Sequence, residues 1–155
     1  MACAAWALGE SGVELVDATV TWAGLVDAGH DVVLHDSLCP MTPPSFIAEC
    51  VREARRSGDV VVGCRPVTDT VKVVSDSRVG ETLDRDHLVA ISSPVVLPAD
   101  VVARLDRRPA TDLARAVADL AAAGHRVRLL PAPPEGRRVA SVEDVRVLGA
   151  LTSKG

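Results

Sequence analysis

The feature that most constrains this chain is a strand–helix–strand pattern packed into a short stretch of sequence. Residues 31–35 (DVVLH) and 59–63 (DVVVG) are β-branched runs of the kind found in buried strands. Between them, residues 43–56 place apolar side chains on one helical face and arginines on the other, with Thr42 as the expected helix cap. Two strands joined by a helix usually pair in parallel through a right-handed crossover, so the pattern predicts a parallel α/β sheet.

The rest of the sequence continues to alternate strands and helices. Residues 88–97 and 127–130 are apolar and typical of strands, and residues 110–123 form an amphipathic helical pattern. A last helix is expected after Ser141, whose hydroxyl suits the cap position and is followed by two acidic residues. Together these elements predict the α/β class: a Rossmann-like, mainly parallel sheet with helices on both faces.

Residues 64–88 interrupt this alternation. The run 65–74 (RPVTDTVKVV) alternates polar and apolar residues, as a half-exposed strand does, and residues 75–86 form a polar link. We interpret the segment as an extended β arm outside the main sheet. An isolated strand pair has marginal stability and needs a covering surface, so the segment predicts a homodimer through residues 64–88.

Length and composition limit the classes of function. The chain has 155 residues, of which 48% are hydrophobic, and suits a single domain over residues 1–155. A net charge of -4 and an aromatic content of 2% are unlike nucleic-acid readers, which present basic surfaces and stacking rings. No apolar run reaches membrane-spanning length, so we expect a cytoplasmic protein with neither a membrane nor a nucleic-acid partner. The four cysteines lack metal-ligand spacing and are expected to be free thiols.

Several short segments resemble, in the same order, the 2-C-methyl-D-erythritol 4-phosphate cytidylyltransferases, the nucleotidyltransferases of the non-mevalonate isoprenoid pathway. Residues 33–37 followed by Pro40 are similar to that family's V-L-x-H-D-A-A-R-P stretch, and residues 66–72 are similar to its P-V-x-D-T-I-K. Shorter matches are VTWAGL at 20–25, ETLDR at 81–85, AISSP at 90–94, TD at 111–112 and SVEDV at 141–145. The resemblance covers residues 17–151, and the order of the motifs carries it.

The resemblance implies a reaction and a set of site residues. Enzymes of this family join CTP to 2-C-methyl-D-erythritol 4-phosphate with Mg²⁺ and release pyrophosphate, on a fold of the nucleotide-diphospho-sugar transferase type. By position, Asp36 matches an acid at the junction of nucleotide and substrate that orients the metal or a hydroxyl. Arg138 aligns with a phosphate-contacting lysine, so Asp36 and Arg138 are the expected catalytic residues. The expected substrate-binding residues are Thr70, Ser93, Thr111 and, reaching the partner subunit's substrate, Arg85.

The first residues depart from the family pattern. The family's glycine-rich loop, G-x-G-x-R followed by P-K, holds the triphosphate with backbone N–H groups and two cations, and the sequence contains no such loop. We interpret residues 4–8 as a remnant of the first strand and residues 9–12 as a shortened loop. Gly9 and Gly12 are then its expected cofactor-binding glycines.

Each site residue also has a structural alternative. Asp36 would be a loop acid after a strand, Thr111 a helix cap, and Arg138 part of a solvated basic edge. Thr70 would be an ordinary strand residue, and Arg85 would pair locally with neighbouring aspartates. Three hypotheses therefore stay open: a divergent cytidylyltransferase, a catalytically degenerate dimeric binding or assembly protein (a pseudoenzyme), and a different small-molecule enzyme on the same fold.

Overall fold

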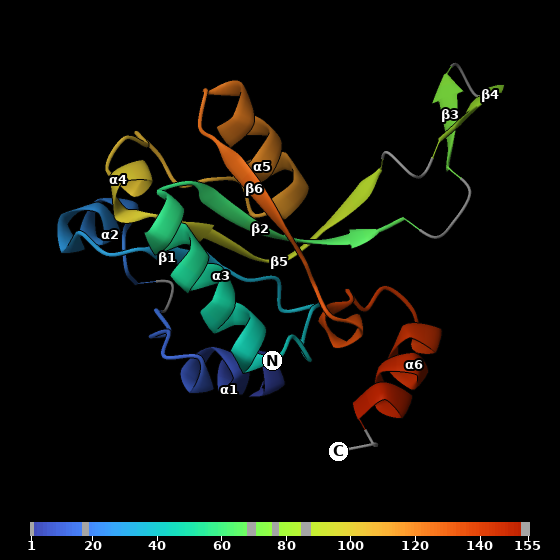
Figure 1. Ribbon diagram of the computed structural model, residues 1–155, viewed down its shortest axis with the longest axis horizontal. Helices are drawn as coiled ribbons and strands as arrows, with labels where there is room; N and C mark the ends of the chain where they lie inside the picture. The colour runs from blue at the N-terminus through green and yellow to red at the C-terminus, as the bar shows by residue number, and fades with distance from the viewer. Residues whose placement is uncertain (1, 17–18, 68–70, 76–77, 85–87, 153–155) are drawn as a thin grey trace.

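The structure is a computed structural model that describes residues 2–16, 19–67, 71–75, 78–84 and 88–152. Figure 1 shows the course of the chain through its helices and strands. In chain order these are α1 (Ala2–Glu10), α2 (Trp22–Ala28), β1 (Val32–Leu34), α3 (Pro44–Ser57), β2 (Val60–Pro66), β3 (Val71–Ser75), β4 (Arg78–Leu83), β5 (Val89–Leu97), α4 (Ala99–Val102), α5 (Leu113–Ala122), β6 (Val127–Pro131), a 3-10 turn (Pro134–Gly136) and α6 (Val142–Thr152).

Four strands form the main sheet, in the order β1-β5-β2-β6. β5 pairs antiparallel with both β1 and β2, whereas β2 pairs in parallel with β6. Three of the four strands therefore run in one direction, and β5 runs against them. The prediction that the strands on either side of α3 pair directly is wrong, because β5 lies between them and satisfies the backbone groups that face it from both sides.

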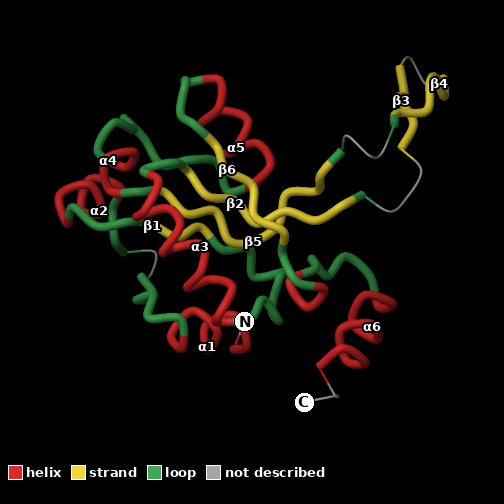
Figure 2. Tube along the Cα trace, viewed as in Figure 1, coloured by secondary structure: helices red, strands yellow, loops and turns green. Residues whose placement is uncertain are grey.

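Helices cover both faces of the sheet, as predicted (Figure 2). Successive strand residues face opposite sides, so each strand contributes to two cores. The core beneath α2, α4 and α5 has as its buried members Val60, Val62, Val95, Leu97, Val101, Val102 and Leu120. The core beneath α3 has as its buried members Phe46, Cys50, Ala54, Val61 and Val96.

The chain leaves the main sheet between β2 and β5. These two strands stay paired at their outer ends, where Arg65 lies opposite Ala90 and Pro66 opposite Val89. Beyond them, β3 and β4 form a separate two-stranded antiparallel sheet that stands apart from the main one (Figures 1 and 2). The predicted arm is thus a hairpin, and the predicted polar link over 75–86 contains a strand, β4.

Two local predictions are wrong. Residues 4–8 belong to the helix α1 and not to a remnant strand, because Ala7 and Leu8 are buried by packing against Ile47 of α3. The alanine-rich start of the chain also has a high helix propensity. At α3, the cap position is taken by Pro43, while the hydroxyl of Thr42 donates to the carbonyl of Cys39 at 3.0 Å.

Other local predictions are confirmed. Cys39, Cys50 and Cys64 are buried free thiols. Ser141 precedes α6 and its hydroxyl accepts from the backbone N–H of Asp144 at 3.1 Å. Within the described ranges, no helix has both the length and the hydrophobicity needed to cross a membrane.

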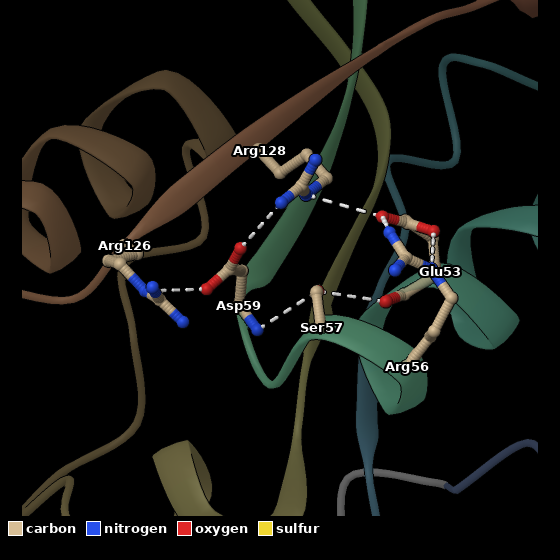
Figure 3. Close-up of polar contacts among 6 residues, drawn as sticks. All are labelled: Glu53, Arg56, Ser57, Asp59, Arg126 and Arg128. Atoms are coloured by element: carbon tan, nitrogen blue, oxygen red, sulfur yellow. Dashed lines mark hydrogen bonds and ion pairs between the residues drawn. The ribbon is translucent and has the colours of Figure 1, made fainter.

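A network of ion pairs ties the amino ends of β2 and β6 to α3 (Figure 3). Asp59, which is buried, pairs with Arg126 at 2.8 Å and with Arg128 at 3.1 Å. Glu53 pairs with Arg128 at 3.3 Å and with Arg56 at 2.6 Å. Each of the three arginines faces a carboxylate, and the shared ion pairs fix this end of the sheet.

Gly63 permits the close approach of β2 and β5. A Cβ on Gly63 would lie 2.7 Å from the carbonyl oxygen of Ser93 and 3.0 Å from the carbonyl carbon, so the backbone would have to move. We expect Gly63→Ala to lower the free energy of unfolding by about 1–3 kcal/mol, the usual cost of overpacking. The measurement is urea unfolding followed by circular dichroism.

The matched control is Gly149→Ala in α6. A Cβ on Gly149 meets no atom within 4 Å, and alanine favours a helix by about 0.5–1 kcal/mol over glycine. This variant should be as stable as the parent or more so. Equal stability of the two variants would contradict the packing argument for Gly63.

Candidate functional site

Asp36 lies just past the carboxyl end of β1, where α/β sheets usually bind ligands. Its backbone N–H donates to the hydroxyl of Ser93 at 2.8 Å, and its carbonyl accepts from Cys39 at 2.8 Å. One carboxylate oxygen accepts from the backbone N–H of Leu38 at 2.9 Å. The carboxylate is therefore held in place by the loop that follows β1.

Arg138 reaches Asp36 from 102 residues further along the chain. Its Nε donates to the second carboxylate oxygen at 2.7 Å, and the two side chains are 55% and 24% exposed. Partial burial tends to raise the pKa of Asp36, but the hydrogen bond from Leu38 and the ion pair with Arg138 outweigh it and lower that pKa below its usual value. Asp36 is thus ionised at neutral pH, and Arg138 is its counter-ion.

The two adjacent serines of β5 hold the two sides of this ion pair. Ser93 accepts from the backbone of Asp36, as described above. The hydroxyl of Ser92, also buried, donates to the carbonyl of Gly136 at 2.7 Å, in the turn that leads to Arg138. The predicted residues Asp36, Ser93 and Arg138 therefore meet, on a framework that depends on β5.

Sequence reasoning missed Ser92 and Arg65. The guanidinium of Arg65 donates to the carbonyl of Pro133 at 2.9 Å, and so fixes the start of the same turn. One signal was available for Ser92: two hydroxyls inside the apolar run 89–97 must find partners when they are buried. No comparable signal in the sequence marks Arg65.

Thr111 lines a cleft of about 280 Å³ beside the end of β1. His35 and Leu34 are among the other residues that line the same cleft. The structural alternative for Thr111 is wrong, because Asp112 caps α5 by accepting from the backbone N–H of Arg115. The Thr111 hydroxyl makes no side-chain hydrogen bond within the part of the chain that the structure describes and is available to a ligand.

The remaining predicted residues do not join this cluster. Gly9 is within α1, and Gly12 lines a different cleft of about 570 Å³ that extends between α2 and α3. Thr70 and Arg85 lie outside the described residues.

His35 is packed beneath the site. Both ring nitrogens are buried, and neither has a hydrogen-bond partner among the described residues. Burial lowers the pKa of the His35 imidazole, and the nearby backbone of Cys39 and the charge of Asp36 only partly oppose this. His35 is therefore a neutral packing residue and not a general base open to substrate.

The described residues do not fit a resident metal centre. Among them, no group of three or more His, Cys, Asp or Glu side chains is arranged to hold an ion. Both carboxylate oxygens of Asp36 already accept hydrogen bonds, from Leu38 and from Arg138.

The mixed sheet with helices on both faces, and a polar cluster at the end of β1, define an α/β protein with a candidate ligand site at the carboxyl end of that strand. The family model of 2-C-methyl-D-erythritol 4-phosphate cytidylyltransferase matches residues 15–151. This chain belongs to that family.

Relatives in the family are longer than this chain. The 2-C-methyl-D-erythritol 4-phosphate cytidylyltransferase of Rhodococcus jostii (strain RHA1) is 32% identical over 148 residues, covering 93% of this chain and 64% of the relative. The protein of the same name from Rubrobacter xylanophilus is 30% identical over 122 residues, covering 77% and 53%. The chain thus spans less than two thirds of the length of these relatives.

Solved structures show the same fold. A crystal structure of 4-diphosphocytidyl-2C-methyl-D-erythritol synthase matches with a TM-score of 0.65 at 23% identity, covering 84% of this chain and 62% of that one. The 2-C-methyl-D-erythritol 4-phosphate cytidylyltransferase from Thermus thermophilus matches with a TM-score of 0.62 at 21% identity, covering 91% and 73%.

His35 predicts a pH dependence of stability. Its folded pKa lies below the ordinary value of 6.5, so the unfolded chain binds more protons once the pH falls below that value. The stability associated with neutral His35 is fully present above pH 6.5 and is lost as the pH falls toward the folded pKa. We expect the free energy of unfolding to decrease between about pH 7 and pH 5.

The measurement is urea unfolding at a series of pH values, compared with two variants. His35→Leu should reduce the slope in this window, whatever it does to the absolute stability. His30→Gln replaces an exposed histidine and should keep the slope of the parent. An undiminished slope in His35→Leu would assign the effect to another group.

Proposed function

We propose that this chain carries out cytidylyl transfer from CTP to 2-C-methyl-D-erythritol 4-phosphate. Membership of the family supports the general class of reaction. The observation that carries the proposal is the 2.7 Å ion pair between Asp36 and Arg138 at the carboxyl end of β1. A guanidinium at that place suits a phosphate ester, because its planar N–H groups match phosphate oxygens.

In the proposed reaction, a phosphate oxygen of 2-C-methyl-D-erythritol 4-phosphate attacks the α-phosphorus of CTP. The bond from that phosphorus to the bridging oxygen of the β-phosphate breaks, and pyrophosphate leaves. Such transfers depend on positioning and on compensation of charge. The proposal includes Mg²⁺, which would neutralise the charge of the triphosphate, and it assigns no protein ligand to this ion.

The described side chains have distinct parts in this proposal. Arg138 binds phosphate oxygens, and Asp36 orients the guanidinium through Nε. Thr111 offers a hydroxyl from the lining of the cleft. Ser93 fixes the Asp36 loop, and Ser92 fixes the turn before Arg138, so both are positioning residues.

A second candidate function is binding of the same phosphorylated ligands without turnover. One observation favours it: Gly9 lies within α1 and Gly12 lines a different cleft, so neither expected loop glycine joins the cluster around Asp36. In that case the ligands would bind to the cluster around Asp36, and no pyrophosphate would form.

We also propose that the arm, residues 64–88, forms the contact between two copies of the chain in a homodimer. β3 and β4 form a sheet of only two strands, which is marginally stable without further cover. We expect light scattering of the full chain at micromolar concentration to give twice the mass of one 16.2 kDa chain. A mass of one chain would contradict the dimer, and with it the contribution of Arg85 to a partner's site.

Asp36→Asn tests the proposed reaction. It keeps the shape of the side chain but removes the charge that orients Arg138, so pyrophosphate release should fall by about 100-fold or more. The assay uses CTP, 2-C-methyl-D-erythritol 4-phosphate and Mg²⁺. Asp119→Asn is the control, because Asp119 pairs with Arg115 on the surface of α5, and it should keep the parent activity.

Two outcomes separate the candidate functions. Ligand binding by the parent chain without pyrophosphate release, beside an active relative as positive control, would support the second candidate. Neither binding nor release by folded protein would contradict both.

A further inference from the structure

Arg108 lies near the site and lacks the ion pairs that compensate the charges of Arg137 and Arg138. Arg138 pairs with Asp36 at 2.7 Å, and Arg137 pairs with Asp144 at 3.1 Å. Arg108 is exposed and makes no ion pair or hydrogen bond with any residue inside the described ranges. A free guanidinium keeps its full capacity to bind an anion.

Arg108 also lines the cleft that contains Thr111. The walls of this cleft are mostly apolar, and its polar lining residues are Glu14, His35, Arg108 and Thr111. The nitrogens of His35 are buried, so they are not exposed to a ligand in the cleft. The donors that remain for an anion are the guanidinium of Arg108 and the hydroxyl of Thr111.

The segment that carries Arg108 is anchored on both sides. Before it, the carbonyl of Leu105 accepts from the indole N–H of Trp22 at 3.0 Å. After it, Pro109 has a fixed φ, and Asp112 caps α5. Arg108 is thus presented by a backbone whose position is set before a ligand arrives, which lowers the entropic cost of binding.

We propose that Arg108 and Thr111 form a phosphate-binding subsite for a phosphorylated small molecule, beside the Asp36–Arg138 pair. The inference rests on the proposed function. It adds a cation, the guanidinium of Arg108, which belongs to none of the family motifs recognised in this sequence. Glu14, which lines the same cleft, opposes an anion there, so its charge limits the affinity of the subsite.

The test is calorimetric titration of the full chain and of Arg108→Ala with CTP, with cytidine and with 2-C-methyl-D-erythritol 4-phosphate. The Arg108→Ala variant should lose about 10- to 100-fold in affinity for the ligand whose phosphate occupies the subsite, as expected for loss of charge-assisted hydrogen bonds. Cytidine has no phosphate, and its affinity should not change. The ligand that loses affinity identifies the source of the phosphate.

Two further variants control for general surface charge. Arg104→Ala removes an exposed arginine from the same segment that does not line the cleft, and it should bind as the parent does. Glu14→Gln should increase affinity for the same phosphorylated ligand. Thermal unfolding of each variant verifies that the fold is kept.

The outcomes distinguish this inference from the proposed function. Unchanged binding by Arg108→Ala, or an equal loss in Arg104→Ala, would overturn the subsite while pyrophosphate release by the parent leaves the function intact. Absence of binding of either phosphorylated ligand to the parent chain would overturn both.

Discussion

The insertion of β5 between β1 and β2 is the constraint on which the rest of the structure depends. Leu34, the last residue of β1, lies opposite Val95, so the antiparallel register carries Ser93 to the level of Asp36. A strand in the opposite direction at this place would bring different residues to the end of β1. On its other side, β5 approaches β2 so closely at Gly63 that no side chain fits between the two backbones.

The contacts around the site differ in what they contribute. The buried hydroxyls fix the two loops: Ser92 donates to the carbonyl of Gly136, and Ser93 accepts from the backbone N–H of Asp36. The ion pair of Asp36 with Arg138 is partly open to solvent, and pairs near the surface contribute little to stability. Loss of this pair would therefore cost the fold little, whereas removal of the serine hydroxyls would free the two loops.

The parts that the sequence predicts are those that local patterns determine. Periodicity identified α3 and α5, and the order of motifs identified Asp36, Ser93 and Arg138. The position of β5 could not be predicted, because strand pairing depends on contacts between residues far apart in the sequence, and local patterns do not determine them. α1 was misinterpreted because a short apolar run suits either a helix or a strand until its packing partner is known. Arg108 carries no local signal, and only its place in a cleft distinguishes it from Arg104.

The two ends of the sheet use arginine differently. At the amino end, Asp59 is buried between Arg126 and Arg128, and the whole network is internally paired (Figure 3). At the carboxyl end, Asp36 engages only Nε of Arg138, which leaves the two terminal nitrogens without a hydrogen bond to any described residue. Asp36 therefore orients this guanidinium without occupying the edge that a phosphate would use. An acid that holds an arginine by one nitrogen acts as a positioning group, and the remaining nitrogens keep the geometry needed for bidentate contact.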